Sequence, residues 1–523
     1  MKKLTLLLFI CLAQGAAALF SQRSVVLIIA DDLSPDYLGF YPDHGDTVAV
    51  PNIRALLKKG VLFHQFTANP YCSATRSTLF TGRYAFRTGI GAVVAAGSGQ
   101  MDSSEFTLPQ RIRNAKPGIG RAQIGKWHLN NPMPQSNLKM PNFFGYEHYE
   151  GPFIGQLNSY TNWTKNTNGV NSTVTTYATT EQVNNAISWL RTQGKKPVFL
   201  WLAFNAPHSP YHLPPAGLHS YTTLSGTAQD IKARPKSYFK AMIQAMDHEI
   251  GRLMDTLRSM NRLDSTDFIF IGDNGNTKQT AQTADTSRVK GSIYEYGIHV
   301  PLIISGPSVR QPGRTSDALV QSVDLFETIP GLLGLNDKLP AGLTTDGRSL
   351  WPIISAAKDS IRPWAFSELF QVPAYSGDGK CIKDQSYKLL RFDNGKEEFY
   401  HLAKDPGEGK NLLATPLDVT AAKHYQYLCS ELESLTGGAT TCQSTGVQHT
   451  SSQGSLLVYP NPANRVLFVT GSAPGELLHI YDLNGRALLH QPAEMPVDLR
   501  ACSPGIYLLQ VGDKMLRIQV AAD

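Results

Sequence analysis

The chain has 523 residues, which is too long for one compact domain and predicts roughly two or three, each able to bury its own core. With 42% hydrophobic and 17% charged residues, its composition is that of an ordinary globular protein. The net charge of +6 is modest, and lysine and arginine are scattered along the chain. The sequence has no basic stripe with interleaved aromatic residues, so we expect no nucleic-acid partner.

The N-terminus has the layout of a secretory signal peptide. Basic residues at the start precede an apolar run over residues 4–13, and small residues follow. A membrane anchor is the alternative, but this run is shorter than the roughly 20 residues that cross a bilayer. Lipidation of Cys11 is disfavoured because Ile10 precedes it. We therefore assign residues 1–19 to a signal peptide and expect an exported protein without a membrane span.

Export changes how the cysteines are interpreted. Removal of Cys11 with the signal peptide leaves five of the six cysteines, namely Cys72, Cys381, Cys429, Cys442 and Cys502. Disulfides are permitted outside the cytoplasm, and the spacing of Cys429 and Cys442 allows a bridge without establishing one. An odd number leaves at least one cysteine for another role.

Five short apolar runs predict buried parallel strands, over residues 25–30, 122–125, 198–204, 268–271 and 300–304. Helical periodicity alternates with them, over residues 52–59, 180–191 and 237–260. Because strands alternate with helices, we predict a parallel α/β sheet for a domain over residues 20–345. Four of the five runs are followed by acids, lysines or histidines, at the strand ends where ligands collect in such sheets.

The rest of the chain predicts smaller units. Residues 346–435 predict a small α+β subdomain, with strand-like runs over residues 387–392 and 398–402. Residues 436–454 are rich in Gly, Ser, Thr and Gln, which predicts a linker. Residues 455–523 alternate apolar and polar residues and contain the hairpin signal Asn484-Gly485, which predicts a β-sandwich.

The strongest local signal is Cys72-Ser73-Ala74-Thr75-Arg76, which the pair Thr81-Gly82 follows. It resembles the signature of type I sulfatases, Cys-x-Pro/Ala-x-Arg with a Thr-Gly turn. In that family a maturation enzyme oxidises the cysteine to formylglycine (3-oxoalanine) before folding. An isolated match is more often a buried free cysteine at a helix start, so the interpretation depends on the rest of the chain.

Four further segments are similar to family segments in the same order, namely Gly125-Lys126-Trp127-His128-Leu129, Ala206-Pro207-His208, Lys290-Gly291 with Tyr294-Glu295, and Asp405-Pro406-Gly407-Glu408. His299 and Tyr296 stand where arginine and glycine are common in the family's lysine block, and these departures concern substrate contacts. The resemblance covers about residues 24–413, most of the chain that remains after export.

The family also implies a calcium site. Asp31-Asp32 after the first run and Asp273-Asn274 after the fourth match its calcium ligands, together with Cys72. These acidic and amide side chains offer oxygen, which suits a hard divalent cation. A single aspartate at a strand end is often a helix N-cap, but a cap does not explain two adjacent pairs.

The resemblance implies an alkaline-phosphatase-like fold with a mixed, mostly parallel sheet, and hydrolysis of sulfate monoesters of a glycan or an aryl alcohol. The ester would be bound by Lys126, His208 and Lys290, with calcium and Arg76 adding positive charge. Hydrated formylglycine would attack sulfur and lose a proton to Asp273. His208 would protonate the leaving alcohol, and His128 would deprotonate the second hydroxyl so that sulfate is expelled.

Two other functions fit parts of this pattern. A formylglycine-dependent phosphodiesterase or phosphonate hydrolase would share the fold and the nucleophile, and the Cys-x-Ala-x-Arg motif carries most of the distinction. A non-catalytic sulfoglycan-binding surface protein would need no nucleophile, so the complete set of acids, lysines and histidines argues against it.

The C-terminal residues resemble a different family. Residues 459–463, 478–486 and 503–507 are similar to the sorting domain that the bacterial type IX secretion system recognises. This implies secretion, or delivery to the cell surface, of a Gram-negative bacterium. A carbohydrate-binding β-sandwich is the alternative, but few aromatic residues are placed to stack on sugars.

Overall fold

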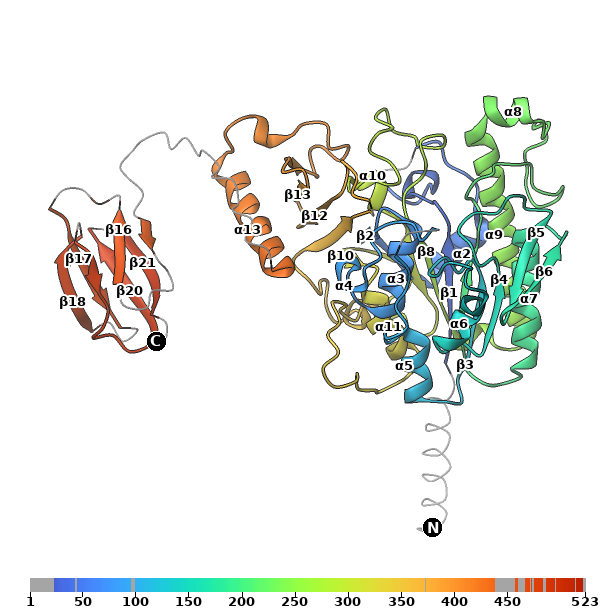
Figure 1. Cartoon of the computed structure of the whole chain (residues 1–523), viewed down its shortest axis with the longest axis horizontal. Coiled ribbons are helices and arrows are strands. Elements are labelled where there is room, and N and C mark those ends of the chain that lie inside the picture. The colour runs from blue at the N-terminus through green and yellow to red at the C-terminus, as the bar shows by residue number, and fades with distance from the viewer. Residues whose placement is uncertain are drawn as a thin grey trace, which may run out of the picture. The chain divides into compact units, whose positions relative to one another are not determined.

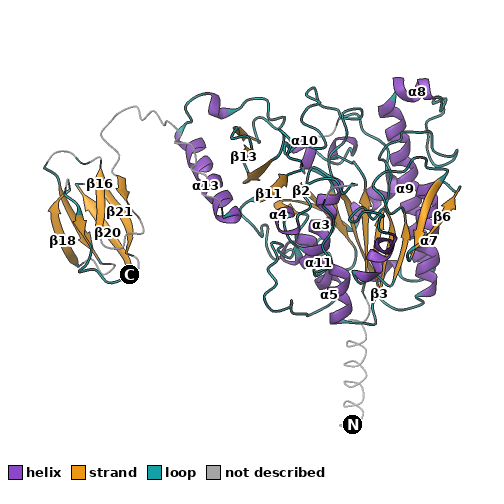
Figure 2. Ribbon diagram, in the orientation of Figure 1, coloured by secondary structure: helices purple, strands orange, loops and turns teal. Residues whose placement is uncertain are grey.

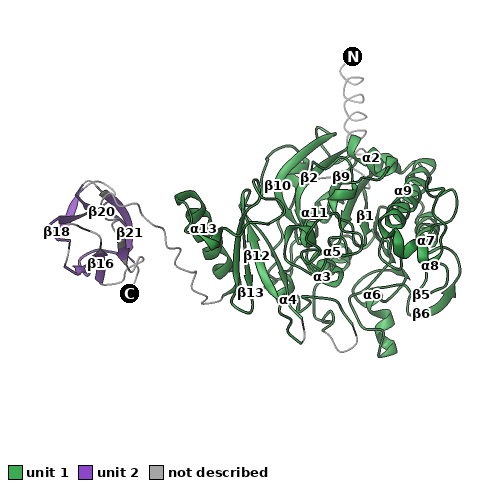
Figure 3. Ribbon diagram, turned by 90° about the horizontal axis from the view of Figure 1, so that it is seen from above, with its two compact units in different colours: residues 1–444 green, residues 445–523 purple. Residues whose placement is uncertain are grey.

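The computed structural model describes residues 23–437 and most of residues 457–520, with short gaps at 43–44, 96–98, 372, 460–465, 471, 473–474, 483–485, 494 and 513. It divides the chain into two compact units, residues 1–444 and 445–523 (Figure 3). The predicted signal peptide and almost all of the predicted linker lie outside the described residues. Among the described residues, no helix is long and apolar enough to cross a bilayer.

The first unit is built on a ten-stranded sheet with the order β10-β2-β9-β8-β1-β7-β3-β4-β5-β6 (Figure 1). Its strands are β1 (Ser24–Ala30), β2 (Gly60–Thr67), β3 (Gly120–Gly125), β4 (His148–Gly151), β5 (Trp163–Thr167), β6 (Val170–Val174), β7 (Val198–Ala203), β8 (Thr266–Gly272), β9 (Leu302–Ser305) and β10 (Arg314–Gln321). The central run β8-β1-β7-β3-β4 is parallel. The mixed, mostly parallel sheet confirms the fold class expected from the sequence.

One predicted strand direction is wrong. The apolar run at residues 300–304 corresponds to β9, which pairs antiparallel with both of its neighbours, β8 and β2. The connection from β8 to β9, residues 273–301, is a loop with one short helix, α10 (Glu295–Ile298), and it returns the chain to the same edge of the sheet. It is therefore not the crossover that parallel neighbours require. A strand that is buried on both faces is apolar throughout, so its sequence does not show whether it runs parallel or antiparallel to its neighbours.

Alternate residues of each central strand face opposite layers of helices. Val26 and Ile28 pack with α2 (Pro51–Lys58), α7 (Ala178–Thr192) and α9 (Pro235–Ser259), which confirm the three predicted helices. Val25, Leu27 and Ile29 pack instead with the layer formed by α3 (Cys72–Thr81), α5 (Leu108–Ala115) and α11 (Asp324–Leu332). The two-residue period of a strand therefore supplies two separate cores, and helices cover both faces of the sheet (Figure 2). Four shorter helices are α4 (Ala85–Thr88), α6 (Met140–Phe143), α8 (Ala228–Ala233) and α12 (Trp351–Ile354).

A second, four-stranded antiparallel sheet follows in the same unit. It comprises β11 (Ala365–Leu369), β12 (Gly379–Lys383), β13 (Tyr387–Phe392) and β14 (Glu397–His401), with helix α13 (Val419–Thr436) after it. A buried ammonium ties β13 to α10, because Lys388 Nζ lies 3.0 Å from carboxylate oxygens of both Glu295, the first residue of α10, and Glu408. Cys429 of α13 is disulfide-bonded, whereas its candidate partner, Cys442, lies outside the described residues.

The second unit consists of two small antiparallel sheets. One contains β15 (Leu457–Tyr459), β16 (Val466–Thr470) and β19 (Val497–Asp498), and the other contains β17 (Leu477–Tyr481), β18 (Ala487–Pro492), β20 (Gly505–Val511) and β21 (Lys514–Val520). Their inner residues form a separate core that includes the fully buried Leu478, Ile480 and Leu509. The predicted Asn484-Gly485 turn lies outside the described residues, and the strands on either side of it, β17 and β18, pair antiparallel.

Because each unit has its own core, we expect the first to fold without the second. A chain ending at residue 444 should be soluble and should unfold at the same temperature as the corresponding transition of the full-length protein. Differential scanning calorimetry of both proteins measures this. A markedly lower unfolding temperature for the truncated chain would show that the second unit stabilises the first.

Candidate active site

Cys72 is the first residue of α3, the helix that follows β2. Its side chain is buried, and burial raises the pKa of the thiol. The helix contains an unusual number of buried hydroxyl groups, and several bond to nearby backbone, as Thr75 Oγ1 accepts from the Asn69 N–H at 2.8 Å. Gly82 ends the helix in the left-handed region with φ of 69°, which accounts for the glycine of the Thr-Gly pair.

Arg76 lies one helical turn beyond Cys72 and is also buried. Its Nη2 donates to Asp273 Oδ2 at 2.8 Å, and its Nη1 donates to the Lys126 carbonyl oxygen at 3.1 Å. Helix α3 is thereby fixed to the ends of two strands, β8 and β3. In this arrangement Arg76 positions the helix as well as contributing positive charge.

The predicted acidic residues meet at the carboxyl ends of neighbouring strands. Ala30 of β1 pairs with Gly272 of β8, so the residues that follow each strand lie beside one another. One oxygen each of Asp31 and Asp273 and the Cys72 sulfur all lie within 4.8 Å of one another. Asp32 continues the cluster in a left-handed conformation with φ of 66°.

Three buried oxygens in this cluster have no hydrogen-bond partner: Asp31 Oδ1, Asp32 Oδ2 and Asn274 Oδ1. An unpaired buried polar oxygen is unfavourable unless another group compensates for its lost hydration. Carboxylate and amide oxygens are also the donors that calcium prefers. The donor set therefore fits a hard divalent cation bound at Asp31, Asp32, Asp273 and Asn274, beside residue 72.

Two lysines neutralise the same carboxylates. Lys126 Nζ donates to Asp31 Oδ2 at 2.5 Å, and both side chains are completely buried. Lys290 donates to Asp32 Oδ1 from the other side of the cluster. Burial alone would lower the pKa of Lys290, but the Asp32 carboxylate raises it above its ordinary value, so this ammonium stays charged.

Two histidines face the same centre from different loops. His128 Nδ1 lies 3.2 Å from Cys72 Sγ, and burial, with the charges of Lys126 and Arg76, holds the pKa of this ring well below its usual range. A neutral ring is able to accept a proton. His208 Nδ1 donates to the Ser209 carbonyl oxygen at 2.7 Å, while Nε2 lies 3.7 Å from Asp32 Oδ2.

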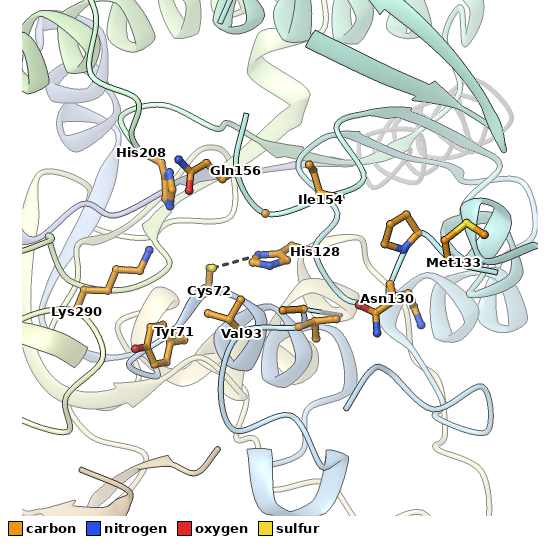
Figure 4. Close-up of a pocket in the computed structure, with 15 residues that line it drawn as sticks. Tyr71, Cys72, Val93, His128, Asn130, Met133, Ile154, Gln156, His208 and Lys290 are labelled. Atoms are coloured by element: carbon orange, nitrogen blue, oxygen red, sulfur yellow. Dashed lines mark hydrogen bonds between the residues drawn. The ribbon is translucent and has the colours of Figure 1, made fainter. Parts of the chain in front are cut away.

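The structure brings all ten sequence-predicted site residues to one place, at the base of a cavity of about 770 Å³ that Cys72, His128, His208 and Lys290 line. In Figure 4 the Cys72 thiol lies between the Lys290 ammonium and the His128 ring. Asp31, Asp273 and Lys126 lie beneath this opening and are fully buried. Their functional roles remain predictions, but their proximity follows from the strand order.

Sequence reasoning missed the residues that hold His128 in place. Ser73 Oγ donates to the His128 carbonyl oxygen at 2.8 Å and accepts from the Val94 N–H at 3.0 Å. Gly155 packs against the imidazole so closely that an added Cβ would lie 2.2 Å from Cε1 of the ring. Ser73 sits inside the recognised motif, whereas nothing in the sequence around Gly155 marks it.

Comparison with known families identifies this arrangement. The sulfatase family profile matches residues 23–335, which is more than half of the chain. The protein belongs to the sulfatase family. A second profile, N-sulphoglucosamine sulphohydrolase C-terminal, matches residues 289–435 of this sulfatase, and a third, the secretion system C-terminal sorting domain, matches residues 457–519.

Individual relatives extend over most of the chain. Arylsulfatase A of Homo sapiens is 27% identical over 489 residues, covering 82% of this sulfatase and 91% of that protein. Arylsulfatase J of Mus musculus is 24% identical over 361 residues, covering 65% of this chain but only 57% of its own length. A solved structure of a protein in complex with its substrate, D-glucosamine-2-N,6-O-disulfate, has a TM-score of 0.66 at 21% identity and covers 81% of this chain and 100% of that one. This last similarity shows the shared fold.

The protein is therefore an enzyme that hydrolyses sulfate esters, an arylsulfatase-like sulfuric ester hydrolase. Family membership disfavours the non-catalytic alternative. The sorting-domain match indicates a protein that is secreted or carried to the cell surface, and it favours sorting over carbohydrate binding for the second unit.

We expect Gly155→Ala to impair catalysis without unfolding the sulfatase, because the new methyl group would displace the His128 ring from residue 72. A shift of about 1 Å in a reacting group can cost roughly 100-fold in rate, so kcat/KM for an aryl sulfate should fall by that order. The matched control is Gly118→Ala, since a Cβ at that exposed position meets nothing within 4 Å. Full activity of Gly155→Ala would show that the backbone at residue 155 can shift to accommodate the methyl group and that it does not position His128.

Proposed function

We propose that this sulfatase cleaves sulfate monoesters of sulfated glycans or aryl alcohols, using Cys72 converted to formylglycine and a bound calcium ion. The observation that carries the proposal is the set of three unpartnered buried oxygens around a buried, non-disulfide cysteine at the start of α3. A free structural cysteine would need neither the acids nor the cations that surround it. The names of the relatives support both kinds of alcohol, because they include arylsulfatases and a protein that binds a sulfated sugar.

The cation would be held by Asp31, Asp32, Asp273 and Asn274, with residue 72 beside them. When bound, calcium supplies charge neutralisation for the sulfate, and the hydrated aldehyde supplies a nucleophilic oxygen. Conversion of Cys72 requires a maturation enzyme that acts before folding, because the folded chain buries this side chain almost completely.

Side chains of the protein would bind the sulfate and transfer the protons. Lys290 lines the pocket beside residue 72 and places a fixed positive charge where the sulfate would bind. His128 is neutral and lies within reach of residue 72, so it is suited to accept a proton there. His208 lines the cavity and uses its Nδ1 to bond the Ser209 carbonyl oxygen, so its Nε2 is the ring nitrogen suited to protonate the departing alcohol.

We further propose that residues 1–19 direct export and that residues 455–523 direct passage by the type IX route to the surface of a Gram-negative bacterium. The sorting-domain match supports this proposal, and so does the separate core of the second unit. The catalytic side chains all lie within the first unit. The boundaries 20–345, 346–435 and 436–454 for the catalytic domain, the small subdomain and the linker belong to the same proposal.

We predict an aldehyde at residue 72 when the sulfatase is produced with a competent maturation system. Peptide mass spectrometry with hydrazide capture detects it directly. Cys381 is an internal control, because it is also free and buried but has no such motif, and it should remain a thiol in the same sample. Active enzyme that contains only unmodified cysteine at residue 72 would contradict the proposal.

We predict that calcium binds in the folded protein and that Asp32→Asn weakens binding, because it removes a ligand charge without changing the size of the side chain. Isothermal titration with Ca²⁺ after chelation measures the affinity, and release of sulfate from an aryl sulfate measures turnover. Asp264→Asn is the control, because its side chain is 91% exposed and distant from the cluster in the sheet. Undiminished turnover after exhaustive chelation would rule out the metal assignment.

The same assays separate sulfate from phosphate chemistry. The proposal expects a much higher kcat/KM for 4-nitrophenyl sulfate than for bis(4-nitrophenyl) phosphate. The reverse order would favour the formylglycine-dependent phosphodiesterase that shares this fold and nucleophile.

A further inference from the structure

The cavity above Cys72 has two chemically different parts. At its base lie the charged and ionisable groups, including Lys290, His128 and His208. Its outer part is bounded by Val93, Ala95, Pro132, Met133 and Ile154, which we call the apolar wall. The uncharged amides of Asn130, Asn131 and Gln156 also line the cavity. In Figure 4 Ile154 and Met133 lie on the far side of His128 from Lys290.

The apolar wall is exposed to an extent that is unusual for large hydrophobic side chains. Met133 is 72% exposed, Ile154 is 46% exposed and Val93 is 37% exposed. Large apolar side chains grouped around a binding cavity mark a surface that a ligand covers. These residues come from three separate loops, after α4, β3 and β4, so their grouping is a product of the fold.

The described residues that line the cavity offer few positive charges to a substrate. Among the described lining residues, Lys290 is the one lysine or arginine, and its ammonium is already bonded to Asp32. A second sulfate or a carboxylate on the substrate would therefore enter the outer cavity without a cation to pair with, at a cost in desolvation.

Resting on the proposed function, we infer that the preferred substrates are monosulfate esters whose alcohol is uncharged and has an apolar face, such as an aromatic ring. Multiply sulfated or uronic-acid-containing sugars are poor substrates. The base of the cavity binds the single sulfate, and the apolar wall covers the alcohol. The apolar wall thus determines specificity, while the groups at the base carry out the chemistry.

A matched pair of substrates tests this inference. We would compare 2-naphthyl sulfate with its 6-sulfonate derivative, since both contain the same reacting ester and ring and differ in one distant negative charge. The sulfonate withdraws electrons and makes the naphtholate a better leaving group, so intrinsic reactivity favours the charged compound. The inference expects the aldehyde-containing enzyme to prefer uncharged 2-naphthyl sulfate by roughly 10-fold or more in kcat/KM.

Substitutions in the apolar wall test whether the wall causes the preference for the uncharged ester. Ile154→Lys should lower kcat/KM for 2-naphthyl sulfate, mainly through KM, and raise it for the 6-sulfonate, so that the ratio between them falls by roughly 10-fold. Ile154→Val, which keeps the surface apolar, should retain the original ratio. Val170→Lys is the charge control, because Val170 is 69% exposed on β6 and does not line the cavity.

The outcomes distinguish this inference from the proposed function. Equal or better turnover of the 6-sulfonate, or of D-glucosamine-2-N,6-O-disulfate, would overturn the inference while leaving the sulfatase mechanism standing. An unchanged ratio in Ile154→Lys would show that the wall does not touch the alcohol and would also overturn it. If aldehyde-containing, calcium-loaded enzyme released no sulfate from any of these esters, the proposed function itself would fail.

Discussion

The site depends on three ion pairs at the carboxyl ends of the central strands, two of them buried on both sides and the third at the base of the cavity. Asp31 pairs with Lys126, Asp273 with Arg76, and Asp32 with Lys290. Three carboxylates and three cations balance, so the cluster is neutral before any ion or substrate enters. Moving such charges out of water is costly, and the pairs are tolerated because each charge has a close opposite partner. Loss of one member would leave its partner buried and uncompensated, which couples the stability of this region to its function.

The strand order makes this balance possible. β8, β1, β7 and β3 are consecutive parallel neighbours, so the segments after them project from one edge of the sheet. Backbone pairing continues one residue beyond each strand, as the Asp273 N–H donates to the Ala30 carbonyl at 3.1 Å and the Lys126 N–H to the Ala203 carbonyl at 2.9 Å. The charged side chains are therefore carried by the rigid sheet rather than by free loops. A divalent cation added to the neutral cluster would create the positive charge that an anionic ester requires.

The two parts of the cavity have different tasks: the base carries out hydrolysis of the ester, and the outer part selects the alcohol. The base is built from strand ends and the buried helix α3, and its side chains are fixed by ion pairs and hydrogen bonds. The outer part is built from loops, in which Asn137 Nδ2 donates to the carbonyl oxygens of Asn131 and Met133. Ser73 links the two parts by bonding both His128 and Val94. Changes in the outer loops can therefore alter which alcohol is accepted without disturbing the charged base.

The sequence by itself determined the chemical identity of the site. The Cys72 motif, the acids after two apolar runs and the lysines and histidines after others were recognisable because catalysis restricts residue type and local spacing. The central strands and the helices α2, α7 and α9 were predictable from apolar runs and periodicity for the same local reason. Only the tertiary structure decided the antiparallel direction of β9, the close packing of Gly155 on His128, and the gathering of Val93, Met133 and Ile154 into one wall. These features depend on contacts between segments far apart in the chain, and neither hydrophobic periodicity nor residue type encodes which distant segment a side chain will meet.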